Sequence, residues 1–465
     1  MCARIRSPAV STFRTAASLL AVALAGRVNA QTADAFRRKT FVEQISADPF
    51  AGAGGSEADT QVEPWIAIDP NDAATVVAVF QQGRFNTNGA SADPGFATSR
   101  DGGRTWTAGN LPHLTVAVGG VFERASDPAV AIGPDGAVYA ATLGVNVSDC
   151  RSGVAVQRSD DHGLTFRDPV LVQDDSACTL FNDKDWIAVD ASPGSPHVGR
   201  IYGAWDRIDS AARVAPTLLR FSDDRAATWS ALVTVSASTA GTVGALPIVQ
   251  PNGDVTVVYN LYSPPTGQVS QTSHDGGLHF DPPVTIGTEQ SNGVPDIRTG
   301  EGLPAATVDP VSGRLYAAWA DGRFRSDDLD DIVLSTSTDG GVTWGPLAVV
   351  NAVRAGDVVN HFTPAVAAHG GTVLVAYRAR RGTTPRVDMR YVVSTDGGAT
   401  FSRERRLGRT ANLDFAATAG GLPYLGDYMG LAASADAVHS VWCVASSVRP
   451  PATQHQTTWS ATLVR

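Results

Sequence analysis

Charged and amide side chains stand at the edges of the short apolar runs that recur through this sequence. Those before the first run of each unit are Glu63, Arg124 with Asp127, Asp183-Lys184-Asp185, Arg298 with Glu301, His361, and Asp427-Tyr428. Those after the second runs are Gln81, Gln82 and Arg84, Asp206 and Arg207, Asn260 and Tyr262, Asp321 and Arg323, and Arg378. Several arginines beside carboxylates suit a carboxylate, phosphate or sulfate group on a ligand. The alternative is that these charges pair with one another and close the middle of the fold.

Motifs of other chemistries are missing from the sequence. It contains no H-E-x-x-H, no paired C-x-x-C and no glycine-rich phosphate loop after a strand. It also lacks G-x-S-x-G, so a serine hydrolase has no support. We therefore expect neither a metal site nor a cofactor.

An eight-residue pattern, S-x-D-x-G-x-T followed by Trp or Phe, recurs six times. The copies begin at Ser99, Ser159, Ser222, Ser273, Ser337 and Ser394, and a spacing of about 50 to 65 residues is typical of a propeller or another array. The pattern predicts a hairpin turn in which the Asp carboxylate accepts hydrogen bonds from backbone N–H groups and glycine supplies a positive φ. The third copy has Ala226 in place of glycine and the fourth has His279 in place of threonine. We expect those two turns to be less regular.

This pattern resembles the Asp-box, or BNR, repeat of the sialidase superfamily. The resemblance implies an all-β propeller with the repeated turns on the face away from the ligand. In such propellers the ligand face gathers the residues before each innermost strand and the loops after each second strand, which is where the charged residues described above stand. Calcium binding by the D-x-G clusters is the alternative, but it needs more oxygen ligands at fixed offsets.

Seven units share one order of elements, although only six carry the repeated turn. Their innermost strands are expected at 64–69, 128–132, 186–190, 247–249, 304–309, 364–367 and 428–432. The third strand of the last unit, 458–463, runs into the C-terminus, so a lone strand at 41–46 can supply its fourth. We expect seven blades, with six as the alternative, in a ring closed by pairing the N-terminal strand with the C-terminal blade. Residues 31–62 would be the leader and ring-closing strand, and 63–465 a single propeller domain.

The comparison with classical sialidases extends to individual positions. Arg84, after the second strand, resembles their second arginine, and Asp93 lies six residues before the first repeat, where their acid/base aspartate stands. Tyr428 opens the last innermost strand, as their nucleophilic tyrosine does. The chain departs from the pattern at Val62, which occupies the position of the first carboxylate-binding arginine.

The resemblance implies a glycoside hydrolase that acts on an anionic glycan. Asp93 would protonate the leaving oxygen, and Tyr428, activated by a carboxylate such as Glu301, would be the nucleophile. The expected substrate-binding residues are Arg84, Arg323, Arg378, Glu63, Asp127 and His361.

Two other functions remain open. One is a non-catalytic propeller that binds a glycan or a protein at the same face, since one fold hosts many functions. The other is a lyase for a uronic-acid polymer, in which His361 would act together with Tyr428 or Tyr262.

The first 30 residues predict a secretory signal peptide. Arg4, Arg6 and Arg14 precede an apolar run at 16–25, and 28–30 (VNA) fits a small-residue cleavage site. The apolar run is too short to span a bilayer. We therefore expect a secreted or periplasmic protein without membrane insertion.

Charge and cysteine content fit that compartment. Without the four arginines of the signal peptide, 32 of the 36 basic residues remain against 46 acidic ones, a formal net charge of −14. Such a surface argues against nucleic acid or anionic membranes as partners, and we expect a monomer that binds a glycan or glycoconjugate. Cys150 and Cys178 are expected to form a disulfide, whereas Cys443 reads as a buried small apolar residue.

Overall fold

The computed structural model describes residues 36, 38–50, 53–352, 356–447 and 454–465. In these residues the regular structure is almost entirely antiparallel strand, with short 3-10 helices at η2 (Ala53–Gly55), η3 (Val116–Val118) and η4 (Leu413–Phe415). The signal peptide expected at 1–30 lies outside the described residues. Within them, no helix has the length and apolar character needed to cross a membrane.

Four-stranded antiparallel sheets follow one another along the chain. The first contains β2 (Gln61–Ile68), β3 (Val76–Arg84), β4 (Ser91–Ser99) and β5 (Thr107–Asn110), and one bridge, Ser91 to Ala125, joins it to β6 (Arg124–Ile132), β7 (Val138–Val145), β8 (Ser152–Ser159) and β9 (Val170–Asp175). The next contains β10 (Leu180–Val189), β11 (Ile201–Asp209), β12 (Thr217–Ser222) and β13 (Val233–Thr234). After it come β14 (Thr242–Val249), β15 (Val255–Leu261), β16 (Gly267–Ser273) and β17 (Val284–Gly287).

The C-terminal half continues the series. One sheet contains β18 (Ala305–Val308), β19 (Leu315–Asp321), β20 (Asp331–Ser337) and β21 (Ala348–Val349). The next contains β22 (Val359–His369), β23 (Thr372–Arg381), β24 (Arg386–Ser394) and β25 (Arg405–Arg406), with β26 (Ala411–Asn412) also paired to β24. A hairpin of β27 (Ala417–Ala419) and β28 (Leu422–Tyr424) precedes the last sheet, which contains β29 (Gly430–Ala433), β30 (Ala437–Ala445), β31 (Gln456–Val464) and β1 (Arg38–Gln44).

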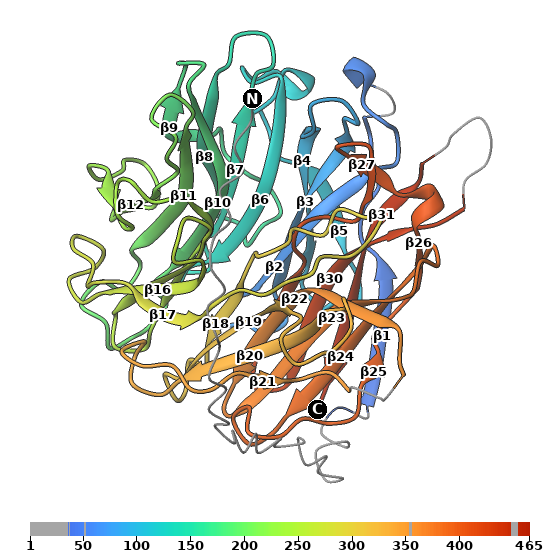
Figure 1. Ribbon diagram of the computed structural model, residues 1–465. Helices are drawn as coiled ribbons and strands as arrows, with labels where there is room; N and C mark the ends of the chain where they lie inside the picture. The colour runs from blue at the N-terminus through green and yellow to red at the C-terminus, as the bar shows by residue number, and fades with distance from the viewer. Residues whose placement is uncertain (1–35, 37, 51–52, 353–355, 448–453) are drawn as a thin grey trace, which may run out of the picture.

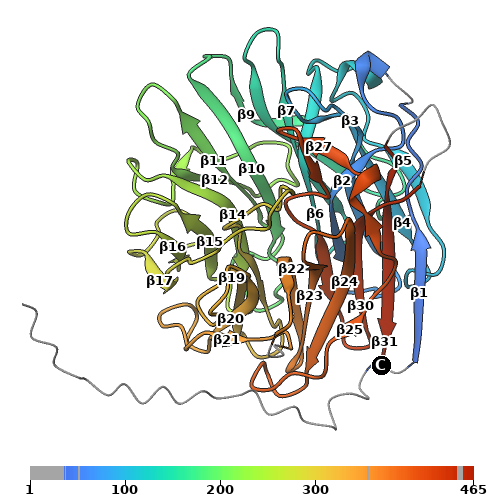
Figure 2. The same ribbon diagram turned by 45° about the vertical axis from the view of Figure 1, so that its right-hand side comes forward.

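The sheets are arranged around a common centre in chain order (Figures 1 and 2). Their first strands, β2, β6, β10, β14, β18, β22 and β29, contact one another in that order, and β29 also contacts β2. Apolar side chains fill the space between neighbouring sheets; for example, Val77 and Val79 of β3 pack with Val130 of β6 and Val138 of β7. This arrangement is that of a β-propeller, the expected fold class.

The second strand of a sheet is enclosed on both faces, and its composition reflects this. All nine residues of β3, VVAVFQQGR, are buried, and near-continuous apolar runs are typical of strands with a layer on each side. Gln81, Gln82 and Arg84 at the end of this strand are buried with it. Buried polar groups need hydrogen-bond partners: Gln82 Nε2 donates to Asn110 Oδ1 of the same sheet, whereas Gln81 bonds to Glu63 and Arg84 of the candidate site.

The two ends of the described chain lie in one sheet. The N-terminal strand β1 pairs with β31, with Val42 opposite Ala461 and Gln44 opposite Trp459. This is the pairing that the sequence predicts for the two terminal strands. It adds an outer strand to the sheet that contains the C-terminus, as Figure 2 shows at the right of the molecule.

The repeated turns have one hydrogen-bond scheme in all six copies. In the first, Ser99 Oγ donates to Asp101 Oδ1 (2.8 Å) and accepts from Gly103 N (2.8 Å). Asp101 Oδ1 accepts from Thr105 N (2.9 Å), and Asp101 Oδ2 accepts from the Thr105 hydroxyl (2.7 Å). The carboxylate thus holds both ends of the turn, as expected.

The expectation that the third and fourth turns are less regular is wrong. Ala226 adopts a φ of 63°, and its N–H donates to Ser222 Oγ (3.0 Å). In the fourth turn, His279 Nδ1 lies 2.7 Å from Asp275 Oδ2, where the other copies have a threonine hydroxyl. The aspartate and serine organise the turn, so the other two positions tolerate replacement.

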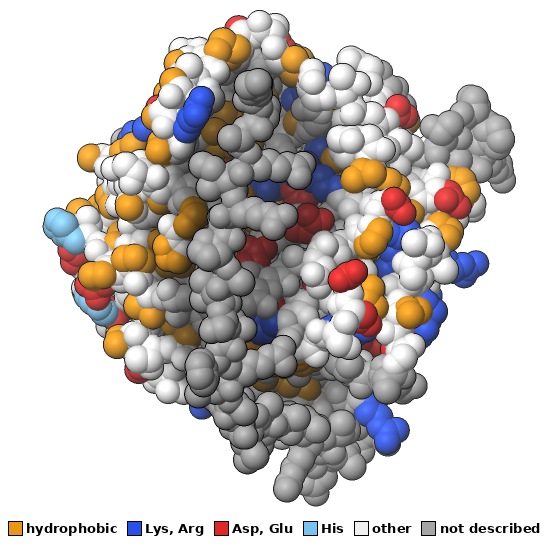
Figure 3. Space-filling model, viewed as in Figure 1, with side chains coloured by type: hydrophobic (Ala, Val, Ile, Leu, Met, Phe, Trp, Pro, Cys, Tyr) orange, Lys and Arg blue, Asp and Glu red, His pale blue; other side chains and the backbone are white. Residues whose placement is uncertain are grey.

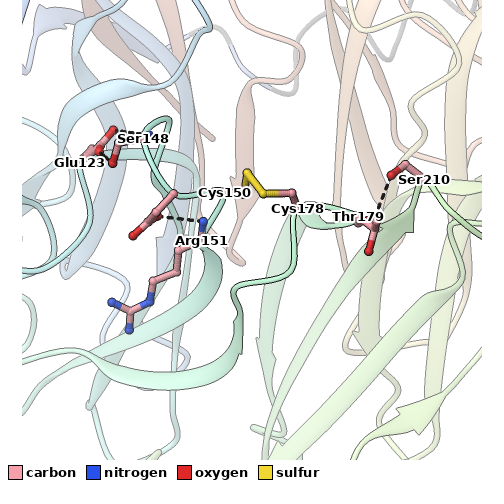
Figure 4. Close-up of a disulfide and its surroundings, with 8 residues drawn as sticks. Glu123, Ser148, Cys150, Arg151, Cys178, Thr179 and Ser210 are labelled. Atoms are coloured by element: carbon pink, nitrogen blue, oxygen red, sulfur yellow. Dashed lines mark hydrogen bonds between the residues drawn. A yellow bond between two sulfur atoms is a disulfide. The ribbon is translucent and has the colours of Figure 1, made fainter.

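The two cysteines expected to pair form a disulfide (Figure 4). Cys150 lies between β7 and β8, and Cys178 lies between β9 and β10, so the bond ties two loops at one end of neighbouring sheets. Cys443 is buried in β30, where burial raises its pKa to about 12. It is a packed thiol, in line with the sequence prediction.

The turn scheme predicts a stability loss for Asp339→Ala. This change removes the acceptor for Thr343 N, Thr343 Oγ1 and Ser337 Oγ. Because the turn is exposed, water replaces part of the loss, and we expect the free energy of unfolding to fall by about 1 kcal/mol, as for a lost helix cap. Urea denaturation measures the change, with the exposed loop variant Asp328→Ala as control. Equal midpoints for the two variants would contradict the structural role of the carboxylate.

Candidate functional site

Several innermost strands carry a bulge at one level of the propeller. The pairing register shifts between Val62 and Trp65 in β2, and shifts at the same level occur in β6, β10, β14 and β22. At these bulges Glu63, Asp127, Lys184 and Thr363 adopt φ values of 47–52°. Non-glycine residues in this left-handed region cost of order 1 kcal/mol each and cluster at functional sites. The bulges redirect the side chains of Glu63, Asp127 and Lys184 toward one point.

That point is the ammonium group of Lys184. Its Nζ lies 3.2 Å from Glu63 Oε1, 2.9 Å from Asp127 Oδ1 and 2.9 Å from Asp427 Oδ2. These residues come from β2, β6, β10 and the segment before β29, and all four are buried. Burial lowers the Lys184 pKa, but the three carboxylates outweigh that effect and raise it well above its ordinary value. We call these four residues, together with Tyr424, the central cluster.

Tyr424, the last residue of β28, joins the cluster through Glu63. Its hydroxyl donates to Glu63 Oε1 and accepts from Asp427 N (3.2 Å). Gln81 Nε2 donates to the other oxygen of Glu63. Both oxygens of the Glu63 carboxylate therefore have partners, which come from its own sheet, the sheet of β10, the β27–β28 hairpin and the segment before β29.

The two carboxylates nearest Tyr424 have opposite pKa shifts. Burial raises the pKa of Glu63 to about 7, although Lys184 opposes the shift. Burial also acts on Asp427, but Lys184 and Arg298 outweigh it and hold the Asp427 pKa well below its usual range. Paired carboxyl groups with separated pKa values are typical of acid/base chemistry.

Three arginines surround Tyr424. The guanidinium carbon of Arg84 lies 5.0 Å from the Tyr424 ring centre and that of Arg298 lies 5.3 Å from it, while Arg378 donates to the adjacent Leu425 O (2.8 Å). Arg298 is the exposed member, and it forms an ion pair with Asp427 (2.7 Å).

In the described part of the chain, Arg84 and Arg378 are buried cations that form no ion pair, although the charge of Arg84 acts on nearby Glu63. Among the described residues, no carboxylate lies within ion-pair distance of either, and the Nε atom of each has no hydrogen-bond acceptor. Burial lowers the pKa of Arg378 to about 10. Burying an unpaired charge is costly, so an anion from outside the chain would stabilise this arrangement.

Asp183 is the more accessible carboxylate beside the central cluster. It is half-buried, and Lys184 N donates to its Oδ1 (3.1 Å). Burial raises its pKa to about 6, with Lys184 opposing and the charges of Asp206, Asp427 and Glu63 adding to the rise. Two positions after Asp183, buried Asp185 has no hydrogen-bond partner on either carboxylate oxygen in the described structure, and burial raises its pKa well above normal.

The channel beneath the cluster is nearly filled. A cavity of about 30 Å³, room for one or two waters, is lined by Trp65, Trp186, Leu246 and Tyr428 among others. The rings of Trp65 and Trp186 meet edge to face at 4.4 Å. In Figure 3, acidic and basic side chains gather at the centre of one face of the molecule.

Four of the residues expected at the site do meet at the centre. Glu63 and Asp127 contact Lys184, and Arg84 and Arg378 border Tyr424. Sequence reasoning noted Lys184, Arg298 and Asp427 without assigning them roles, and it missed Tyr424. Among the described residues, the hairpin of β27 and β28 that carries Tyr424 has no counterpart in the other units, so the repeat pattern gave no signal for it.

Asp93 stands apart from the central cluster, whereas Tyr428 borders it, with Lys184 Nζ 5.7 Å from the centre of its ring. Asp93 is buried in β4, where its Oδ1 accepts from Thr115 Oγ1 (2.8 Å), and burial raises its pKa well above normal. The Tyr428 hydroxyl donates to Pro128 O (3.0 Å), and its ring packs on Trp186 at 5.0 Å. Neither residue contacts the other among the described side chains. These are the contacts of packed residues.

Glu301 and Arg323 also stand apart from the central cluster. Glu301 is exposed and accepts from Thr299 Oγ1 (3.2 Å). Arg323 pairs with Asp321 of its own sheet (2.7 Å). Local partners therefore satisfy both side chains in the described structure.

His361 lies inside a polar network rather than on an open face. Its Nδ1 is 3.3 Å from Asp331 Oδ1 and its Nε2 is 3.5 Å from Glu404 Oε2. Burial lowers its pKa, but the two carboxylates outweigh that and raise it. The ring also meets Tyr377 at 5.5 Å. Within the described residues its partners are these groups and Asn351, not the tyrosines that a lyase would use.

Comparison with known proteins gives only distant likenesses. No protein-family model matches the sequence, and no curated protein matches it either. Among solved structures, a Hadza microbial sialidase is 18% identical with a TM-score of 0.49, covering 69% of this chain, which spans 63% of the sialidase. An α-L-arabinofuranosidase of Fusarium graminearum, in complex with arabinobiose, is 12% identical with a TM-score of 0.49, covering 92% of this chain and 98% of that one. A protein of unknown function from Dyadobacter fermentans is 16% identical with a TM-score of 0.47, covering 91% and 99%.

The raised pKa of Glu63 predicts a pH dependence of stability. Its folded-state pKa of about 7 lies above the ordinary value of 4.5, so its contribution is fully present below about pH 4.5 and is lost as the pH rises through about 7. Glu63→Gln keeps an acceptor for Tyr424 but does not titrate. The stability of this variant relative to wild type should therefore increase from pH 5 to pH 8, as measured by urea midpoints.

The control for this experiment is Glu43→Gln, which changes an exposed glutamate of β1. Its difference from wild type should stay constant across the same pH range. If the Glu63→Gln difference is equally constant, Glu63 does not titrate in this window and the electrostatic description of the cluster is wrong.

Proposed function

We propose that this protein is a glycoside hydrolase that acts on a glycan bearing a carboxylate. The observation that carries the proposal is the pair of buried, carboxylate-free guanidinium groups of Arg84 and Arg378 beside the Tyr424–Glu63 hydrogen bond. Arginine binds carboxylates in a bidentate, planar geometry. The carboxylate of the substrate would supply the anion that these two cations lack.

Tyr424 and Glu63 supply the nucleophile. The Tyr424 proton passes along the existing hydrogen bond to Glu63 Oε1, and the phenolate oxygen attacks the anomeric carbon. The pKa of Glu63, about 7, suits a base that must accept a proton near neutral pH. The positive charge of Lys184 offsets the negative charge that the Tyr424 oxygen and the Glu63 carboxylate share during this transfer.

Asp183 supplies the acid. Its pKa of about 6 leaves part of the population protonated near neutral pH, and its half-buried carboxyl group can meet a substrate. It donates its proton to the leaving oxygen as the glycosidic bond breaks. Asp183 then deprotonates a water molecule, whose oxygen attacks the anomeric carbon and releases Tyr424, and Glu63 returns the phenol proton.

Substrate entry requires Arg298 to move. Tyr424 is 1% exposed and lies beneath Arg298, whose side chain is 48% exposed. The substrate carboxylate would draw the Arg298 guanidinium from Asp427 onto itself, uncovering the tyrosine.

The burial of Tyr424 also favours a second candidate, a non-catalytic glycan-binding propeller. If the ion pair of Arg298 with Asp427 persists when a ligand is bound, the arginines recognise an anionic sugar without chemistry. This candidate shares the ligand with the first but predicts no turnover.

The wider architecture and location are part of the proposal. The ordered contacts of the first strands and the pairing of β1 with β31 support seven blades in a ring closed by the two terminal strands. The sequence pattern of residues 1–30 supports export, and the excess of acidic residues supports a glycan rather than a nucleic acid as partner. We further propose that the protein acts as a monomer.

Release of a fluorogenic group from carboxylated glycosides, sialosides and uronides, tests the proposal. Asp183→Asn should lower kcat by about 10²- to 10⁴-fold, the usual contribution of a general acid. Arg298→Ala should lower kcat/KM by about 100-fold, since a charged hydrogen bond to the substrate is lost. Tyr424→Phe should lose more activity than Tyr428→Phe.

Neutral glycosides are the matched control. They lack the group that the arginines hold, so Arg298→Ala should not lower kcat/KM for them. Saturable binding of a carboxylated sugar without product would establish the binding module instead. Full activity of Tyr424→Phe would remove the nucleophile from the proposal.

A further inference from the structure

Tyr262 is an exposed aromatic side chain that the fold nevertheless holds in place. It follows β15 directly and is 51% exposed. Its N–H donates to Gly241 O (2.9 Å), and Ser263 Oγ accepts from Gly241 N (3.0 Å). The ring lies against Gly241, where a Cβ would stand 2.6 Å from a ring carbon. Any side chain at position 241 would displace the ring, so one face of the Tyr262 ring can pack here only because residue 241 is glycine.

A chain of contacts leads from Tyr262 to the proposed acid. Thr242, next to Gly241, donates through its hydroxyl to Asp206 Oδ1 (2.7 Å). Asp206 lies opposite Asp183 in the pairing of β10 with β11. Partial burial raises the Tyr262 pKa, with added effects from the charges of Asp206 and then Asp183. The phenol therefore lies within electrostatic reach of both carboxylates.

Single exposed aromatic residues are common on protein surfaces and need no function. Tyr262 differs because its ring packs on a glycine and lies within electrostatic reach of Asp183, to which we assign a proton transfer. An amphipathic ring that packs against the backbone on one side and is exposed to solvent elsewhere is suited to stack on the apolar face of a sugar ring.

We propose that Tyr262 is a stacking platform for the sugar on the leaving-group side of Asp183. This inference rests on the proposed hydrolase function. It specifies the substrate as an anionic sugar linked to a neutral hexopyranose, whose ring stacks on Tyr262 while Asp183 protonates the oxygen between the two. Tyr262 is then a specificity-determining residue and takes no part in bond breaking.

The test compares two substrates of purified protein. Both contain the same anionic sugar, but the leaving group is fluoride in one and lactose in the other. With the lactoside, Tyr262→Ala should raise KM about tenfold with little change in kcat. With the fluoride, which has no ring to stack, it should match wild type. Tyr262→Phe keeps the stacking face and should stay within about twofold of wild type on both substrates.

Leu278→Ala is the matched control. Leu278 has the same exposed fraction, 51%, and belongs to the same sheet, but it lies in the fourth repeated turn. The pairing of β15 with β16 places that turn at the end of the sheet opposite Tyr262. This variant should match wild type on both substrates, and its unfolding temperature provides the reference for Tyr262→Ala.

Two outcomes overturn the inference. Unchanged kinetics of Tyr262→Ala on the lactoside would show that no sugar stacks there, and equal losses on lactoside and fluoride would place Tyr262 in the reaction itself. If no substrate is turned over, the proposed function fails, and titration of wild type and Tyr262→Ala with lactose alone, followed by NMR, still decides the platform. A saturable change in NMR chemical shifts of the wild type, with an affinity for lactose about tenfold lower in Tyr262→Ala, supports the stacking platform. Absence of lactose binding to wild type refutes it.

Discussion

The ammonium of Lys184, held by three buried carboxylates, is the interaction on which the rest of the site depends. Glu63 and Asp127 come from neighbouring sheets and Asp427 from the segment before β29, and without the lysine their charges would repel one another in a region from which water is largely excluded. The ion contacts therefore set the distance between innermost strands at one end of the propeller. Strained backbone at Glu63, Asp127 and Lys184 is tolerated because it brings the charges together.

The site combines a region of ion pairs with a region of arginines that lack one. Around Lys184 each carboxylate contacts the ammonium group, whereas Arg84 and Arg378 form no ion pair with a carboxylate among the described residues. Tyr424 lies between the two regions, with its hydroxyl on Glu63 and its ring beneath arginines. Under the function proposed above, the carboxylate of the sugar completes the second region.

Sequence reasoning recovered the parts of the protein that repeat. The spacing of the repeated turns predicted the series of sheets, and the lone strand expected at 41–46, together with the missing fourth strand of the last unit, predicted the pairing of β1 with β31. It also collected Glu63, Asp127, Arg84 and Arg378 at the correct ends of their strands. It assigned the nucleophile to Tyr428 because that residue opens the last innermost strand, whereas the hairpin before that strand brings Tyr424 to Glu63.

What the sequence determined by itself is local. Apolar runs, turn residues and the two paired cysteines depend on neighbours along the chain or on a simple repeat, so their pattern is visible without coordinates. The tertiary structure alone decided which charged residues are paired, because partners such as Glu63 and Tyr424 are separated by 361 positions. It also decided that His361 is enclosed and Asp183 accessible, since burial depends on how whole sheets pack around the centre.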